Sequence, residues 1–171
     1  MDAGLVTYGL LAGLAIAVLY AAFTDIRSRK ITNRLTLAVA AGAPLFWWAS
    51  GLAPWPGIAL QLGLAAAMFA FGALMFALRQ MGGGDVKLLT AIALWLPPSS
   101  FLILMLMICI ANGVLTVFMV TRHRRIQRAG LEAKKLQIPY GVSVAACMIV
   151  LLAVRYGPGL SETLTTNSML S

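Results

Sequence analysis

Acidic side chains are scarce in this 171-residue chain, which has only five of them: Asp2, Asp25, Asp85, Glu132 and Glu162. Charged residues of both signs make up 11% of the sequence, whereas 61% of the residues are hydrophobic and the mean hydropathy is +0.91. A soluble domain of this length cannot bury so much apolar surface, so lipid has to be part of its solvent. The composition therefore predicts an integral membrane protein surrounded by membrane lipids.

Residues that bind metals or form disulfides are also few. The chain has two cysteines, Cys109 and Cys147, each inside an apolar run, and one histidine, His123, inside a basic stretch. The cysteines do not have C-x-x-C spacing, so the sequence indicates neither a zinc site nor a disulfide framework. We expect no metal site and no cofactor.

Six apolar runs alternate with polar breaks, at about residues 4–23, 35–50, 56–78, 86–97, 100–121 and 139–154. The first, third and fifth runs have the length of about 20 residues that a helix needs to cross a bilayer, and the others are shorter. Glycine, proline and serine in the breaks favour turns. The sequence predicts an all-α, polytopic membrane protein with about six transmembrane helices, a single domain over residues 1–156 and a loose polar C-terminal tail over residues 157–171.

The basic residues gather in alternate loops, which predicts the orientation. Of the 13 Lys and Arg residues, 12 fall in the loops after the first, third and fifth runs, and only Arg155 lies elsewhere. The positive-inside rule places these loops in the cytoplasm and both termini outside. The net charge of +8 is then explained by topology and anionic headgroups, without nucleic acid as a partner. We expect the four tryptophans, near the opposite ends of the runs, to form an interfacial belt: Trp47, Trp48, Trp55 and Trp95.

Two of the five carboxylates, Asp25 and Asp85, lie where a cytoplasmic loop meets an apolar run. An ionisable group within a membrane is expensive and is a functional candidate for that reason. Residues 86–97 supply about 18 Å of helix, which is less than the roughly 30 Å of the hydrocarbon core. Asp85 is therefore expected below the cytoplasmic surface, reached by the three glycines at 82–84. Glycine permits positive φ and close approach of another backbone, so we expect a hydrated notch lined by bare main chain.

Other interpretations of these residues stay open. Asp85 can serve only as the N-cap of the fourth helix, and Asp25 can cap the first loop and pair with Arg27 or Arg29. The glycines followed by Lys87 suggest a phosphate loop, but the Gly-Lys-Ser/Thr ending is absent. Asn112, inside the fifth run, is expected to form a hydrogen bond between helices.

Three segments resemble motifs of the type IV prepilin peptidases, in the family's order. Residues 82–85 (Gly-Gly-Gly-Asp) match the Gly-x-Gly-Asp motif, and residues 86–89 (Val-Lys-Leu-Leu) continue it. Residues 25–35 resemble the segment around the family's first catalytic aspartate, and residues 138–141 (Ile-Pro-Tyr-Gly) resemble the start of its last span. Thr32 departs from the proline that many relatives have before the asparagine, and neither carboxylate is affected.

The resemblance implies an intramembrane aspartyl endopeptidase of the bacterial inner membrane. Asp25 and Asp85 would be its catalytic pair, with Gly82 and Gly84 beside the substrate backbone and Lys87 either tuning the pair or holding an acidic group of the substrate. The substrate would be a prepilin with its leader peptide, and pilus-assembly machinery or a second copy would be further partners. The chain is most similar to the short members associated with tight-adherence (Flp-type) pili, which implies cleavage without N-methylation.

Two other classes of function remain as alternatives. One is a small proton-coupled carrier, which is disfavoured because neither inverted repeats nor mid-span carboxylates are present. The other is a non-catalytic membrane subunit of a pilus or secretion system, whose carboxylates only cap helices. Replacing each aspartate by asparagine separates these classes, because a peptidase loses cleavage with either change.

Overall fold

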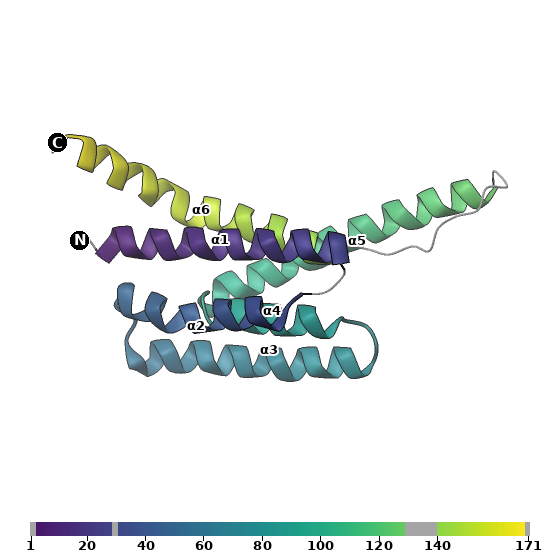
Figure 1. The fold of residues 1–171 in the computed structure, drawn as a ribbon, viewed down its shortest axis with the longest axis horizontal. Coiled ribbons are helices and arrows are strands. Elements are labelled where there is room, and N and C mark those ends of the chain that lie inside the picture. Colours follow the sequence, from purple (N-terminus) through teal and green to yellow (C-terminus); the bar gives the residue numbers. More distant parts are fainter. Residues whose placement is uncertain (1–2, 29–30, 129–139, 170–171) are drawn as a thin grey trace.

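The structure is a computed structural model that describes residues 3–28, 31–128 and 140–169, and these residues are almost entirely helical. Within them no strand occurs, which confirms the predicted all-α class. The helices lie side by side in an elongated bundle (Figure 1). In chain order they are α1 (Ala3–Ser28), α2 (Asn33–Ala49), the short π-helical segment η1 (Pro54–Ile58), α3 (Ala59–Ala77), α4 (Gly83–Ala93), α5 (Pro98–Arg128) and α6 (Tyr140–Met169).

Glycine, proline and serine set several of the helix ends, as the sequence predicts. The chain leaves α2 through Ser50, whose N–H donates back to Phe46 O, and through Gly51 at φ +65°, a conformation that suits glycine. Pro98 is the first residue of α5, where its missing N–H leaves no bond unmade. Pro139, expected in the first turn of the sixth helix, lies outside the described residues.

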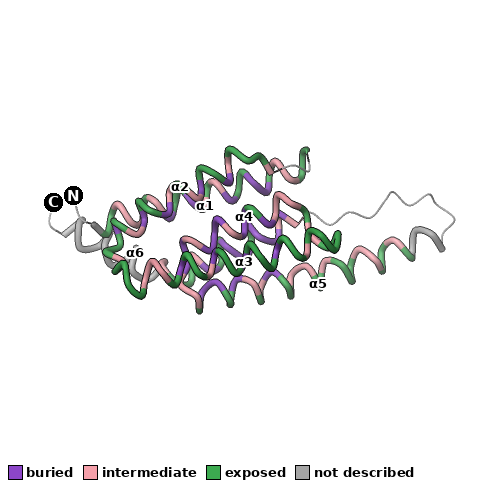
Figure 2. The backbone as a smooth tube through the Cα atoms, turned by 90° about the horizontal axis from the view of Figure 1, so that it is seen from below, coloured by how far each residue is buried: buried purple, intermediate pink, exposed green. Residues whose placement is uncertain are grey.

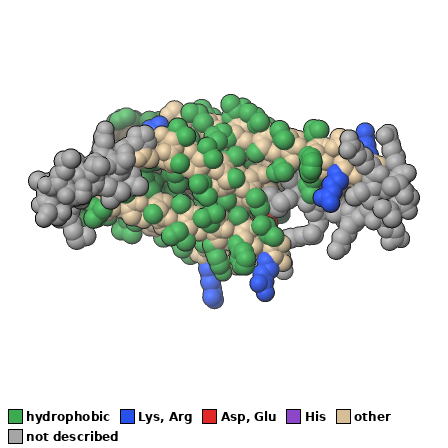
Figure 3. Space-filling view, turned by 90° about the horizontal axis from the view of Figure 1, so that it is seen from above, with side chains coloured by type: hydrophobic (Ala, Val, Ile, Leu, Met, Phe, Trp, Pro, Cys, Tyr) green, Lys and Arg blue, Asp and Glu red, His purple; other side chains and the backbone are tan. Residues whose placement is uncertain are grey.

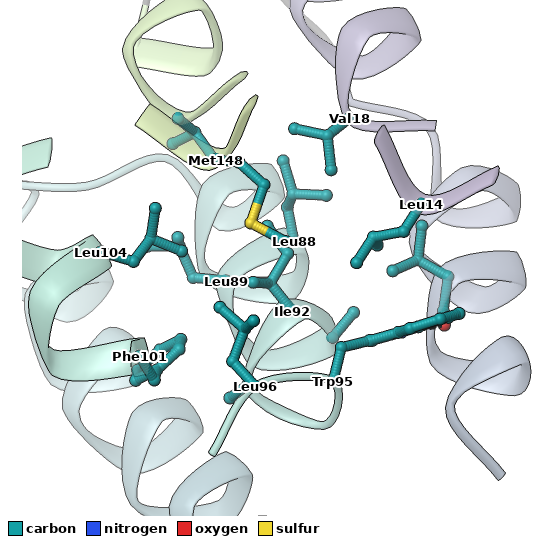
Figure 4. Packing of buried hydrophobic residues seen from close by; sticks show 14 of the residues in the cluster. Leu14, Val18, Leu88, Leu89, Ile92, Trp95, Leu96, Phe101, Leu104 and Met148 are labelled. Atoms are coloured by element: carbon teal, nitrogen blue, oxygen red, sulfur yellow. Dashed lines mark hydrogen bonds between the residues drawn. The ribbon is translucent and has the colours of Figure 1, made fainter. Parts of the chain in front are cut away.

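The short helix α4 is the centre of the bundle. Leu88, Leu89 and Ile92 are at most 1% exposed, and Figure 2 shows that buried residues concentrate along this helix. Figure 4 shows these side chains meeting Val18 of α1 and Met148 of α6, with residues of α5 close by. Without a hydrophobic effect to hold helices together in lipid, close packing of this kind keeps them associated. The packing of α4 therefore holds the first turn of this helix, with its side chains, in a fixed position.

Trp95 does not belong to an interfacial belt, so that prediction is wrong for this residue. Its side chain is only 3% exposed, and its Nε1–H donates to Val39 O over 2.9 Å. The ring lies against Gly42, where an added Cβ would come within 2.7 Å of it. The glycine provides the space and the carbonyl satisfies the indole, so the core can accept the tryptophan. Trp48 and Trp55 are 82% and 81% exposed, whereas Trp47 is half-buried and donates from Nε1–H to Leu94 O over 2.8 Å. The belt stays a prediction for these three residues.

Four helices in the described part of the chain are long and apolar enough to cross a membrane. They are α1, η1 with α3, α5 and α6, and their spans are Gly4–Ser28, Pro54–Ala77, Pro98–Arg124 and Tyr140–Gly157. Helices α2 and α4 have 17 and 11 residues, or about 26 Å and 17 Å of length. Figure 3 shows hydrophobic side chains spread over the middle of one face, among backbone and other side chains, with only a few Lys and Arg side chains. The protein is therefore a membrane protein, whereas the count of six spans and the placement of both termini outside stay predictions.

The backbone of α6 remains helical through Met169. The stretch after Gly157, expected to be a loose polar tail, is therefore helical for most of its length, since its polar composition does not stop the helix. The division into a domain over residues 1–156 and a tail over residues 157–171 stays a prediction.

Candidate active site

A cavity of about 490 Å³ lies where the end of α1, the segment before α2 and the start of α4 come together. It contains both carboxylates that the sequence singles out, although they are 60 positions apart in the chain. The glycines at 82–84 form one wall of this cavity, as predicted for a notch lined by main chain. The lining residues are Asp25, Ile31, Thr32, Asn33, Gly82, Gly83, Gly84 and Asp85.

Asp25 lies in the last turn of α1, because this helix continues to Ser28 instead of ending before the aspartate. Its Oδ2 accepts a hydrogen bond from the backbone N–H of Gly141 over 2.9 Å. Within the described residues Asp25 forms no ion pair with Arg27, and Arg29 lies outside them. The start of α6 therefore holds this carboxylate, and pairing with Arg27 is not its role.

Asp85 is the third residue of α4, and the N-cap position belongs to Gly82, with φ −73° and ψ 141°. Gly82 has no side chain that could cap the helix, and Asp85 contacts the Gly82 backbone from inside the first turn, so the interpretation of Asp85 as the N-cap residue is wrong. Burial, and to a smaller extent the negative charge of Asp25, raise the pKa of Asp85 to about 6, and a hydrogen bond with the Gly82 backbone opposes this rise. Asp25 therefore lies close enough to Asp85 to influence its protonation.

The glycines before Asp85 are needed for space rather than for positive φ. Gly82 has a negative φ, and among the described glycines only Gly51 has a positive one, so that part of the prediction is wrong. A Cβ on Gly82 would lie 2.8 Å from Asp85 Oδ2, and a Cβ on Gly84 would lie 3.1 Å from Ile31 Cβ. Bare main chain at these positions lets the helix start approach both the carboxylate and the segment before α2.

Lys87, a candidate for tuning the carboxylates, does not line the cavity. Its exposed side chain donates a hydrogen bond from Nζ to Asn33 Oδ1 over 2.9 Å. Asn33 itself lines the cavity, so Lys87 contacts the cavity wall through this hydrogen bond.

A second, mainly apolar cavity of about 760 Å³ lies between α3 and α5. Its lining includes Met81, next to the glycines, and Tyr140, next to Gly141. Asn112 also lines it, and its Oδ1 is buried without a hydrogen-bond partner among the described residues. The expected hydrogen bond between helices is therefore not formed by this oxygen.

Sequence reasoning missed Gly141 and the part of the cavity wall formed by residues 31–33. Both lie in segments whose resemblance to family motifs was noted without a role for these residues. The contact of Gly141 with Asp25 joins residues 116 positions apart, which no local pattern reveals.

Two coupled carboxylates beside open main chain can perform general acid and general base chemistry on a peptide placed between them. No group of three or more His, Cys, Asp or Glu side chains that could hold a metal ion occurs in the part of the chain that the structure describes. The arrangement is that of an acid–base pair.

Comparison with known proteins adds an independent observation. A model of the type IV leader peptidase family matches residues 12–117, which include Asp25, the glycines and Asp85 and end before Gly141. No curated protein and no solved structure matches the chain. Because the matched segment is more than half of the sequence, the chain belongs to the type IV leader peptidase family.

Proposed function

We propose that this protein is an intramembrane aspartyl endopeptidase that removes the leader peptide of type IV prepilins of the Flp type. Cleavage would occur at the cytoplasmic face of the bacterial inner membrane, with Asp25 and Asp85 as the catalytic pair. One observation carries the proposal, namely the cavity that both carboxylates line, with the charge of Asp25 acting on Asp85. Membership of the type IV leader peptidase family supports the same reaction class.

The chemistry follows from a pair of carboxylates that shares one proton, since two negative charges this close do not coexist cheaply. The ionised partner takes a proton from a water molecule as the water oxygen bonds to the scissile carbonyl carbon. The protonated partner first donates a hydrogen bond to the carbonyl oxygen, where negative charge develops. The same partner then transfers its proton to the leaving nitrogen as the C–N bond breaks, giving a carboxylic acid and a free amine while the other partner holds the proton from water.

The wall of the cavity suggests how a prepilin reaches the pair. Gly82 and Gly84 leave main chain uncovered beside Asp85, so an extended substrate backbone can lie against them. We further propose that the product amine is released without methylation. Mass spectrometry of the cleaved pilin tests this, because a methylated N-terminus would contradict it.

Leader cleavage by the purified protein tests the proposal directly. A prepilin with its leader is incubated in detergent with the wild type, Asp25→Asn and Asp85→Asn, and products are separated by gel mobility. Both variants should lose cleavage, because neither carboxylate alone supplies acid and base. Asp2→Asn, which removes a carboxylate elsewhere in the chain, is the matched control and should cleave normally. Near-normal cleavage by either catalytic variant rules out the aspartyl assignment, whereas no cleavage by the wild type favours a non-catalytic structural subunit.

A further inference from the structure

The contact between Asp25 and Gly141 is the starting point. Gly141 is the second residue of α6, and its backbone N–H donates to Asp25 Oδ2 over 2.9 Å. N–H groups in the first turn of a helix have no partner inside the helix, and the positive end of the helix dipole adds to their attraction for a carboxylate. The start of α6 thus supplies a donor that the end of α1 uses.

The residue at this position has to be glycine for the contact to form as it does. A Cβ at position 141 would lie 2.9 Å from Asp25 Oδ2 and 3.0 Å from Asp25 Cβ, so the carboxylate would be displaced. Gly113, in contrast, has nothing within 4 Å of an added Cβ. The Asp25 carboxylate therefore occupies space that a side chain at position 141 would fill.

The hydrogen bond distinguishes the two carboxylates. An oxygen that accepts an N–H has no hydroxyl hydrogen pointing at that N–H, so the contact leaves only Oδ1 of Asp25 to exchange a proton with water or with Asp85. Asp85, by contrast, is in surroundings where burial favours its neutral form. The site is asymmetric, because the donor to Asp25 comes from a different helix, α6, whereas Asp85 is affected mainly by burial and contacts the Gly82 backbone at the start of its own helix.

We propose that Gly141 is a positioning residue whose amide N–H and missing side chain fix Asp25 as the proton acceptor of the pair, leaving the shared proton on Asp85. This inference rests on the proposed peptidase function and assigns the two roles within it. Asp25 takes the proton of the attacking water, and Asp85 donates its own proton to the leaving nitrogen. After release of the products, a proton passes from Asp25 to Asp85 and the pair returns to its starting state.

The first test changes the glycine. Gly141→Ala should lower kcat for leader cleavage by about ten- to a hundredfold, with KM and thermal stability near those of the wild type, because Asp25 moves while substrate contacts remain. Gly113→Ala is the matched control and should match the wild type in all three. A Gly141→Ala protein with normal kcat overturns the inference, while cleavage by the wild type still supports the peptidase function.

The second test removes the donor without adding an atom. Incorporating glycolic acid at position 141 replaces the amide N–H by an ester oxygen, and kcat should again fall about tenfold or more, because an N–H donor to a charged group is lost. Normal kcat in this ester variant overturns the role of the N–H even if Gly141→Ala is slow.

Infrared spectroscopy shows which of the two carboxyl groups is protonated, without a measurement of activity. At about pH 5, above the usual range of an aspartate, the band of a protonated carboxylic acid should remain in Asp25→Asn and disappear in Asp85→Asn. The opposite pattern overturns the assignment of roles. If the bands behave as expected but the wild type cleaves no prepilin, the proposed function fails and the asymmetry of the pair stands.

Discussion

Lys87 of α4 and Asn33 of α2 are joined by a hydrogen bond of 2.9 Å between Nζ and Oδ1, although 54 positions separate them. The bond connects the exposed face of the central helix to a residue of the cavity wall. Since Lys87 contacts the wall and not the aspartates, its contribution should concern the shape of the cavity more than the protonation of the pair.

Lys87→Met should therefore reduce leader cleavage only several-fold, with an unchanged pH profile, because a single exposed hydrogen bond contributes about 1 kcal/mol. Lys87→Gln, which retains a donor, is the matched control and should lie closer to the wild type. Steady-state kinetics across a pH series measures both. A shifted profile in Lys87→Met would mean that the lysine acts on the carboxylates directly.

Activity should fall as the pH rises through about 6. Burial raises the pKa of Asp85 to that value, and the reaction needs this carboxyl protonated, so kcat/KM should decrease on the alkaline side. The measurement is the pH dependence of kcat/KM at low substrate concentration. A value that increases steadily from pH 6 to 8 would contradict the role of Asp85.

The same raised pKa predicts a pH dependence of stability. The folded protein binds the Asp85 proton more tightly than the unfolded chain, so stability should decrease as the pH rises from the ordinary value of 3.8 to about 6. Thermal unfolding in detergent across this window measures the effect. Asp85→Asn has no group to titrate, and its Tm should lack this part of the slope.

Gly84→Val should reduce cleavage by about tenfold or more while the protein still folds. A Cβ at position 84 would already lie 3.1 Å from Ile31 Cβ, and two further methyl groups would enter the cavity or displace its wall. Gly113→Val, where the added Cβ meets nothing within 4 Å, is the control. Cleavage and Tm are both measured. Normal cleavage by Gly84→Val would show that the substrate backbone does not lie against this glycine.

Chelators and reagents for serine or cysteine nucleophiles should leave cleavage intact, because the proposed reaction uses two carboxylates and water. The assay is leader cleavage after treatment with EDTA, and separately with a thiol-alkylating reagent. Restoration of an EDTA-inactivated protein by zinc would show that the metal-free pair is wrong.

The orientation can be tested by cysteine labelling in spheroplasts. With Cys109 and Cys147 replaced by alanine, an impermeant reagent should label Leu52→Cys but not Arg27→Cys, because the basic loops face the cytoplasm. Disrupted membranes serve as the control, since both positions should then react. Labelling of Arg27→Cys in intact spheroplasts would invert the topology and place cleavage on the other side.

The helices were predictable because lipid-facing sequences reveal themselves in long apolar runs interrupted by turn residues. The pair Asp25 and Asp85 was predictable because so few acidic residues exist in the chain. The burial of Trp95 was not predictable, because an indole near the end of an apolar run suits the membrane interface as well as the protein core. Its burial depends on Gly42 and the carbonyl of Val39, both on another helix.

The cavity was predictable only in part. The glycines at 82–84 were expected beside Asp85 for two reasons, positive φ and close approach of another backbone, and the structure uses only the space they leave. Glycine serves both needs, and a sequence does not distinguish them. The contact of Gly141 was not predictable for a different reason. It joins this residue to a carboxylate on the first helix, far away in the sequence.

Asp85 is the third residue of the 11-residue helix α4, so it lies about 12 Å from the opposite end of that helix at 1.5 Å per residue. Because α4 is enclosed by its neighbours, Asp85 cannot slide along the membrane normal as a loop residue would. Under the proposed function, the depth of Asp85 selects the bond that is cut. A substrate anchored in lipid brings only one stretch of its backbone to the level of this aspartate. Lengthening α4 by one turn would move that level by about 5.4 Å, and the choice of scissile bond would move with it.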